Sequence, residues 1–560
     1  MGTADMLIER NFEYERTAQG GYLLKKCKNK DLTEIEIPAT VTELAACCFE
    51  RCENLTFVSF CGTLPCIPAR CFAECTALEE IELPEGVTEI GPYAFEGCIE
   101  LTDIEIPNGV EIVDDSAFCG CSSLDTLTVP PSVHRFCANA FEGCKELTDV
   151  NISDLKAWCN IYLENEMASP LYCGAELYLN GESIVDLVIP DGVIQLHPFA
   201  FANCTLLESV HLPASLGLLS PLAFYRCAMI ERFSVDAGNS RYRAVNGTAV
   251  LREDNELVLA CEEMESLPAC TKSIAGGAFS ACSDMTELSI GADISLCDGA
   301  FYGLDSLKRL TFSPQHGDTR DLTCFQPAYR WGYLMQNAFE LDELEIVGVE
   351  CLHARALNCF GKIKRLKLPS TLTEIARSAL CDADIGQCNI PKGLKKIALQ
   401  GVCLNNMRVT VDPGSVFAMR QGCLVDTSRE ALVATFGNTA IPRGIRIIQE
   451  GAFSGNSSLT SIRIGDTVTD VLDYAFSGCE NLRSVTFSPS IQRISGSAFR
   501  GSTNLQEICF EEKSAWRAEG CNSLSDNAVT HFWPGMRQDM AFRFLGPTSI
   551  KWKMLYKQKG

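Results

Sequence analysis

Cysteine and histidine are the residue types in this chain that could bind a metal or act as nucleophiles. The sequence has 31 cysteines and 6 histidines among 560 residues. Structural zinc sites and thiol–disulfide catalysts commonly present C-x-x-C pairs, and no such pair occurs. The nearest Cys/His arrangement, Cys351-Leu-His353, is explained more simply as one core residue beside one surface residue. We therefore expect no metal site and no cofactor.

Paired carboxylates could instead serve acid–base chemistry. Glu80 and Glu82 lie two residues apart, so they share one face of a β-strand. On an open sheet nothing would shift their pKa values, whereas catalytic carboxylates need such shifts. The sequence also lacks a phosphate-binding glycine loop, a G-x-S-x-G turn and an H-E-x-x-H motif. We predict a protein that is not an enzyme. A site hidden within residues 154–180 or 313–337 is the enzymatic alternative.

A repeat of 23 residues positions these side chains. Its consensus is L-x-x-I-x-I-P-x-x-V-x-x-I-x-x-x-A-F-x-x-C, as from Leu78 to Cys98. Six successive units begin at Leu32, Leu55, Leu78, Leu101, Leu124 and Leu147. Later units begin at Ile184, Leu207, Met285, Leu307, Leu341, Ile363, Leu459, Leu482 and Leu505. This regularity indicates a solenoid, in which each coil packs on its neighbours.

The consensus also predicts the path of each coil. In L-x-x-I-x-I, alternate side chains point inward as in a short β-strand, and the proline ends the strand because it has no N–H for a ladder. The Val, Ile and Ala-Phe positions continue the apolar core around the coil. Stacked coils would form a parallel sheet. The predicted fold class is therefore a mostly β leucine-rich-repeat solenoid with β-hairpin insertions.

Nine cysteines occupy the last position of the consensus. They are Cys52, Cys75, Cys98, Cys121, Cys144, Cys204, Cys227, Cys282 and Cys479. Stacked inside the coils, they would act as small buried side chains with a weak donor rather than as metal ligands. The other 22 cysteines share no position of the repeat.

The two ends of the chain depart from the repeat. Residues 1–31 alternate like a β-hairpin and are expected to cap the first coil, because a bare terminal coil would expose its core. Residues 511–560 are expected to cap the last coil. Their basic residues favour a docking tail as the alternative.

Between these ends, repeats are predicted over 32–152 and 184–510, separated by an aromatic-rich insertion at 153–183. Two segments of similar sequence, near 236–261 and 412–435, are predicted hairpin insertions. Residues 313–337 are predicted to be an irregular insertion.

The formal net charge is −25, from 47 basic and 72 acidic residues. Residues 32–152 alone have 22 acidic and 4 basic side chains, a balance of −18. Nucleic-acid binding needs a basic footprint, so we expect none. The sequence has no run of about 18 or more apolar residues, so we expect no membrane insertion. No secretory leader is recognisable, so we expect a cytoplasmic protein, with a cell-surface or secreted protein as the alternative.

The repeat resembles that of the BspA-like leucine-rich-repeat family. The resemblance rests on the motif at Leu78–Cys98 and on V-D-x-G segments at Val235 and Val411, and it extends from residue 12 to residue 516. It implies a right-handed arc with a parallel sheet on the concave side and short strands or 3-10 turns on the convex side. In that family the repeats are associated with surface adhesion and with binding host or partner proteins. This sequence shows no wall-sorting motif and no accessory anchoring domain.

A partner would meet the outward side chains at the third and fifth positions of L-x-x-I-x-I. These are mostly acidic in the first coils and partly basic later. The candidate partner-binding residues are Glu34, Glu36, Phe57, Glu80, Glu82, Asp103, Glu105, Asp149, Arg309, Arg365, Lys367 and Arg463. A ladder of carboxylates about 5 Å apart would attract a basic protein surface or a divalent cation. Solubility alone is the alternative explanation of this charge.

Two functions fit this reading. The first is a monomeric scaffold or recognition protein that binds another protein through its sheet face. The second is an adhesin displayed on a cell surface, which would bind a host glycoprotein or the extracellular matrix.

Overall fold

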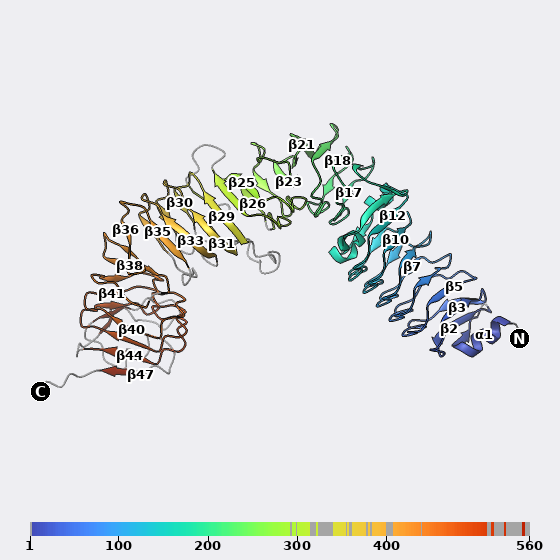
Figure 1. The fold of residues 1–560 in the computed structure, drawn as a ribbon, viewed down its shortest axis with the longest axis horizontal. Coiled ribbons are helices and arrows are strands. Elements are labelled where there is room, and N and C mark those ends of the chain that lie inside the picture. Colours follow the sequence, from blue (N-terminus) through green and yellow to red (C-terminus); the bar gives the residue numbers. More distant parts are fainter. Residues whose placement is uncertain are drawn as a thin grey trace. The chain divides into compact units, whose positions relative to one another are not determined.

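The structure is a computed structural model, and it forms two compact units, Met1–Met285 with Cys297–Asp305 and Thr286–Leu296 with Ser306–Gly560 (Figure 1). The residues that it describes are 3–18, 20–291, 294–297, 299–313, 321–322, 340–353, 356–357, 361–376, 379–380, 383–398, 407–437, 439–511, 517–519, 531–533 and 551–554.

In the first unit, the L-x-x-I-x-I segments form parallel strands, which we call the front sheet. Its strands fall into three groups: β3 (Glu34–Ile37), β5 (Phe57–Phe60) and β6 (Glu80–Ile81); β8 (Asp103–Glu105), β10 (Thr126–Val129), β12 (Asp149–Ile152) and β14 (Glu176–Leu179), with β15 (Glu182–Ser183) at its edge; and β16 (Asp186–Val188), β18 (Ser209–Leu212) and β20 (Arg232–Val235). Each rung of a group pairs residues about one repeat apart, such as Thr126 with Asp149.

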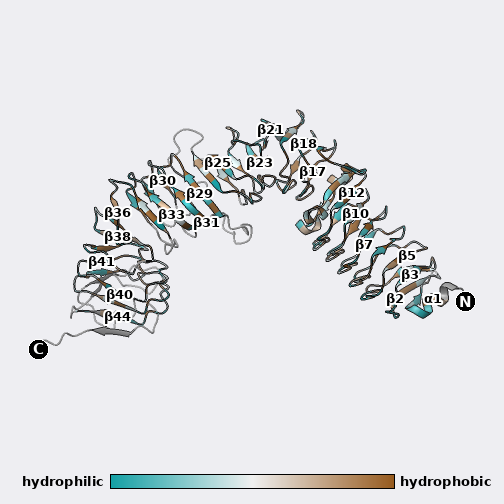
Figure 2. Ribbon diagram, viewed as in Figure 1, coloured by the Kyte–Doolittle hydropathy of each residue, from teal (hydrophilic) through white to brown (hydrophobic). Residues whose placement is uncertain are grey.

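The V-x-x-I segments form two-residue strands on the other side of each coil, which we call the back sheet. It contains β7 (Glu89–Ile90), β9 (Ile112–Val113), β11 (Arg135–Phe136) and β13 (Tyr162–Leu163), and then β17 (Gln195–Leu196) and β19 (Leu218–Leu219). All of these pairs are parallel. Hydrophilic and hydrophobic residues alternate along the coils (Figure 2).

The core is built from columns of identical residues. The rings of Phe49, Phe72, Phe95, Phe118 and Phe141 stack with centroids 4.9 to 5.5 Å apart and interplanar angles of 15° or less. The leucines that begin the repeats, such as Leu78 and Leu101, have no exposed surface. Burial of these apolar side chains between neighbouring coils is the main stabilising term.

The turn between Phe and Cys requires left-handed backbone. Gly97 and Gly120 have φ of +71° and +76° there, a region that glycine enters without steric cost. Arg51 and Glu74 occupy the same position with φ of 58° and 57°, and their side chains form an ion pair 2.8 Å long.

The N-terminal residues form a helix and a hairpin. Helix α1 (Thr3–Asn11), which the sequence did not predict, precedes β1 (Phe12–Arg16) and β2 (Tyr22–Cys27). These two strands are antiparallel, and β2 also pairs in parallel with β4 (Val41–Leu44). Ile8 and Phe12 are buried and join the core of the coils.

Residues 153–183, the predicted aromatic-rich insertion, continue both sheets of the first unit. They form a longer coil that contains α2 (Leu155–Cys159), β13, the 3-10 turns Glu166–Ala168 and Pro170–Cys173, and β14. Strand β13 continues the back sheet and β14 continues the front sheet. Cys173 donates to the Phe141 carbonyl, 3.2 Å away, as the cysteines of regular coils do. The segment keeps the core positions while its turn follows a longer path.

The two predicted hairpins are three-stranded meanders. The first contains β21 (Tyr242–Val245), β22 (Ala249–Arg252) and β23 (Glu256–Ala260), and the second contains β36 (Phe417–Arg420), β37 (Cys423–Asp426) and β38 (Ala431–Thr435). In each meander the third strand pairs in parallel with the next back-sheet strand, β24 (Ser273–Ile274) or β39 (Ile447–Ile448).

The second unit repeats the arrangement. Its front sheet contains β25 (Glu287–Gly291), β27 (Arg309–Ser313), β29 (Glu340–Ile346), β31 (Lys362–Lys367), β33 (Asp384–Ile390) and β35 (Arg408–Val411), and then β40 (Ser461–Ile464), β42 (Ser484–Phe487), β44 (Glu507–Phe510) and β47 (Lys551–Met554). Its back sheet contains β28 (Asp321–Leu322), β30 (Cys351–Leu352), β32 (Glu374–Ile375) and β34 (Lys396–Ile397), and then β39, β41 (Asp470–Val471) and β43 (Arg493–Ile494). The short strands β26 (Ser295–Leu296), β45 (Arg517–Glu519) and β46 (His531–Trp533) complete the list.

The predicted fold class is confirmed: both units consist of stacked parallel β coils with almost no helix. Most of the irregular insertion at 313–337 and of the C-terminal cap or basic tail at 511–560 lies outside the described residues.

Candidate functional site

The front sheet of the first unit presents a row of carboxylates. Because side chains alternate along each strand, Ile35 and Ile37 point into the core while Glu34 and Glu36 are exposed. Coils further along repeat the pattern. The resulting acidic face consists of Glu34, Glu36, Glu80, Glu82, Asp103, Glu105 and Asp149, all exposed except the half-buried Asp149.

The strand register aligns these residues in rungs, with interruptions. Phe57 lies between Glu34 and Glu80, and Thr126 lies between Asp103 and Asp149. The strands that carry Glu80 and Asp103 follow one another, joined by a hydrogen bond from the Thr102 N–H to the Glu79 carbonyl. The ladder predicted from the sequence is therefore present, but a half-buried Phe57 and a threonine rung divide it.

The carboxylates of the acidic face have no basic partner among the described residues of the chain. Three of the four basic side chains of residues 32–152 pair with carboxylates outside this face. Arg51 pairs with Glu74, Arg70 pairs with Glu50 and Glu96, and Arg135 pairs with Glu164, all at 2.7 to 2.9 Å. The charge of the acidic face is therefore not compensated within the unit.

This negative charge raises the pKa of two neighbouring groups. The Glu36 carboxylate accepts a hydrogen bond from the Cys61 thiol and raises the pKa of that thiol. The charge of Asp149 raises the pKa of Tyr178, whose hydroxyl is also hydrogen-bonded to it. Both shifts favour the neutral form of the neighbour, as expected beside an uncompensated carboxylate.

The basic candidates belong to the second unit, and each is engaged by an acid. Arg309 lies 2.7 Å from Glu287, and Lys367 lies 2.6 Å from Glu343. Arg365 also reaches Glu343, at 3.4 Å. Arg463 pairs with Asp466 and Glu511, both at 2.7 Å. Their charge is therefore largely neutralised within the second unit.

Sequence reasoning missed a group of exposed apolar side chains in the coils from 184 to 230. Val188, Ile194 and Leu218 are 58%, 67% and 54% exposed, and Leu206 and Met229 are 46% and 55% exposed. The available signal was an apolar residue at repeat positions where other coils have polar ones.

Asp114, Asp115 and Cys137 form a group whose potential ligand atoms lie within 4.8 Å of one another. Internal hydrogen bonds explain it. The Cys137 thiol bonds to Asp114, and the Ala138 N–H donates to Asp115 at 3.1 Å. Burial and this bond raise the pKa of Cys137 to about 12.

The sequence matches the description "BspA type leucine rich repeat region" over residues 24–153, 173–243, 261–329, 332–406 and 433–527. These segments make up well over half of the chain. The chain belongs to the BspA-type leucine-rich-repeat family. No curated protein matches its sequence.

Solved structures with a similar fold are leucine-rich-repeat proteins. A leucine-rich cell surface protein from Faecalibacterium prausnitzii is 18% identical, with 90% of this chain and 94% of that one covered at a TM-score of 0.29. A leucine-rich-repeat protein from Bacteroides ovatus is 16% identical, with 98% of both chains covered and a TM-score of 0.29. In this BspA-type chain, no helix among the described residues is long and apolar enough to cross a membrane.

Proposed function

We propose that this BspA-type protein is a non-catalytic binding protein, and that the acidic face of its first unit binds a basic surface of another protein. The observation that carries the proposal is the uncompensated charge. The arginines of the same coils pair with other carboxylates, while those of the acidic face form no ion pair with any described residue.

Physical reasoning favours a role beyond solubility. Like charges on neighbouring strands are destabilising, so a row of carboxylates on one sheet face weakens the coils that carry it. A single-sign surface also raises the association rate of an oppositely charged partner, and this effect falls with ionic strength. Binding by the acidic face should therefore weaken as salt is added.

The test is a pull-down from the native source with the full chain and its variants. We expect Glu80→Lys/Glu82→Lys/Glu105→Lys to lose most of the partner that the wild type recovers. The matched control is Glu53→Lys/Glu100→Lys/Glu146→Lys, which changes the net charge equally at exposed positions outside the acidic face. Equal recovery by wild type and the first variant, or equal loss by both variants, would refute the proposal.

Location separates the two kinds of binding protein. We propose a cytoplasmic scaffold, for which fractionation should recover the chain in the cytosol. Recovery of the chain at the cell surface would instead favour an adhesin that binds its partner through the same acidic face.

A further inference from the structure

Each meander interrupts the back sheet and leaves a strand edge. The back sheet stops at β19 before the first meander and at β34 before the second. In the parallel register, the N–H groups of Leu218 and Lys396 donate to carbonyls of the preceding coil. The N–H groups of the following residues, Leu219 and Ile397, therefore point toward the next coil. A meander stands there instead of a strand, and these N–H groups need another acceptor.

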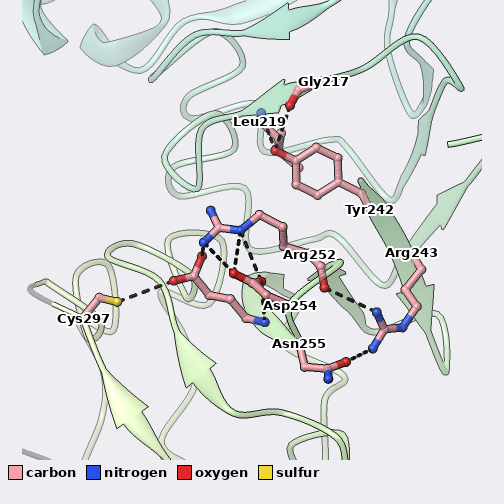
Figure 3. A network of polar contacts seen from close by, with 9 residues as sticks. Gly217, Leu219, Tyr242, Arg243, Arg252, Asp254, Asn255 and Cys297 are labelled. Carbon is pink, nitrogen blue, oxygen red and sulfur yellow. Dashed lines mark hydrogen bonds and ion pairs between the residues drawn. The ribbon is translucent and has the colours of Figure 1, made fainter. Parts of the chain in front are cut away.

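In the first meander a tyrosine hydroxyl replaces the missing strand (Figure 3). The Leu219 N–H donates to the Tyr242 hydroxyl at 3.0 Å, and that hydroxyl donates to the Gly217 carbonyl at 3.5 Å. Tyr242 is only 6% exposed. One hydroxyl thus satisfies both backbone groups of the edge.

The second meander has phenylalanine at the equivalent position. Tyr242 begins β21 and faces Arg252, the last residue of β22; Phe417 begins β36 and faces Asp426, the last residue of β37. Phe417 has no hydroxyl to offer. Within the part of the chain that the structure describes, nothing accepts a hydrogen bond from the Ile397 N–H. Ile397 is only 8% exposed, and buried N–H groups without a partner are rare.

A pocket opens at this edge. Its volume is about 210 Å³, smaller than the sites of drug-sized ligands. Apolar side chains of Ile375, Ile397, Ala398 and Phe417 line it together with the charged side chains of Glu374, Lys395, Lys396, Asp426 and Arg429. The pocket therefore combines some apolar surface with a backbone donor that no described residue satisfies.

Each of the two acidic groups at the pocket lies near a basic one, Glu374 near Lys396 and Asp426 near Arg429, and Lys395 adds a further positive charge. Lys396 lies 3.4 Å from Glu374. The buried Asp426 carboxylate accepts from the Ser428 N–H and hydroxyl at 3.0 and 2.6 Å and from the Arg429 N–H at 3.3 Å. Both acidic groups are thus engaged, so a ligand that offers a hydroxyl meets no unpaired carboxylate in the pocket.

We propose that this pocket binds a small neutral phenol, whose hydroxyl takes the place that the Tyr242 hydroxyl holds in the first meander. The hydroxyl accepts from the Ile397 N–H and donates to the Lys395 carbonyl, the counterpart of Gly217. The aromatic body lies against Phe417 and Ile375. The site belongs to the second unit and is independent of the acidic face.

The test titrates phenol into the full chain and follows binding by ligand-observed NMR, with toluene as the matched ligand that lacks the hydroxyl. We expect phenol to bind the wild type and toluene to bind at least about tenfold more weakly, the effect of one buried hydrogen bond. Phe417→Tyr supplies the hydroxyl from the chain, so it should abolish phenol binding and raise the melting temperature. Tyr242→Phe removes the internal hydroxyl at the first meander and should leave phenol binding at the second unchanged.

The proposal is overturned if phenol does not bind the wild type, which would leave water as the occupant. It is equally overturned if toluene binds as tightly as phenol, or if Phe417→Tyr folds with an unchanged melting temperature and still binds phenol. Loss of phenol binding in Tyr242→Phe would place the site at the first meander and also contradict it.

Discussion

At the scale of single residues, the cysteine column satisfies a backbone acceptor inside each coil. The thiols of Cys98 and Cys121 donate to the carbonyls of Phe72 and Phe95, both at 3.2 Å. Ser502 occupies the same position and donates to the Phe476 carbonyl at 2.6 Å. The position therefore requires a small donor, and cysteine supplies one with an otherwise apolar side chain. The predicted structural role of this column is confirmed.

Burial of these thiols predicts a loss of stability at alkaline pH. Burial raises the pKa of Cys98 and Cys479 to about 12, from 9.0 for a free thiol. The folded state therefore keeps protons that the unfolded chain releases, and stability falls as pH rises from about 9 to about 12. We expect the melting temperature to drop through this window. Cys98→Ser/Cys479→Ser, which keeps the donor but does not ionise, should show a shallower drop. An identical slope in wild type and variant would contradict this explanation.

At the scale of elements, coils approach so closely that some positions admit no side chain. A Cβ added to Gly91 would lie 2.9 Å from both the Ala69 nitrogen and the Ile67 oxygen of the preceding coil. The Gly91 N–H donates to that same Ile67 carbonyl at 2.8 Å, so the backbone cannot move away without losing the bond. By contrast, a Cβ added to Gly465 would have no atom within 4 Å.

These two glycines give a matched pair of substitutions. We expect Gly91→Ala to destabilise the protein by about 1–3 kcal/mol, because the coil must shift to relieve contacts with backbone atoms. Gly465→Ala should be neutral or slightly stabilising, since it adds no clash and reduces the freedom of the unfolded chain. Urea unfolding curves of both variants measure the difference, and equal midpoints would show that the coils can separate freely.

Much of the fold was predictable because the repeat leaves few choices. Leu78, Phe95 and Cys98 each recur at the same position of successive repeats, and this constant spacing determines which side chains stack. The path of residues 153–183 could not be predicted because the consensus is lost there, although Cys173 keeps its place in the column. The acidic face followed from strand alternation, but the ion pairs that neutralise Arg365 and Lys367 depend on the register between coils. The pocket at Phe417 depends on a strand edge that only the three-dimensional arrangement reveals.

At the scale of the whole molecule, charge is distributed unevenly along the chain. Residues 32–152 hold 22 acidic and 4 basic side chains, while several basic residues of the second unit, among them Arg309, Lys362, Lys364 and Lys367, are paired with carboxylates. Repulsion within the first coils therefore opposes folding there, and the stacked aromatic and aliphatic core must exceed it.

This imbalance predicts stabilisation by salt. Raising NaCl from about 0.01 M to about 1 M shortens the screening length from about 30 Å to about 3 Å, less than the spacing of neighbouring rungs. We expect the melting temperature to rise over this range. The rise should be smaller in Glu80→Lys/Glu82→Lys/Glu105→Lys, which removes part of the repulsion. A melting temperature that does not change with NaCl in the wild type would show that the carboxylates interact too weakly to matter.

The stack of phenylalanine rings also bears on how such a chain can change in length. Phe72 stacks on Phe95 in the same way that Phe95 stacks on Phe118. The ring centroids are 5.4 and 5.2 Å apart, and the ring planes are nearly parallel. Deleting one 23-residue turn would therefore bring Phe72 against Phe118 in an unchanged setting, and duplicating one would add another equivalent layer. Genes for this architecture can gain or lose whole turns by recombination between their own repeats, and each event lengthens or shortens the exposed sheet by one strand while the interior stays intact.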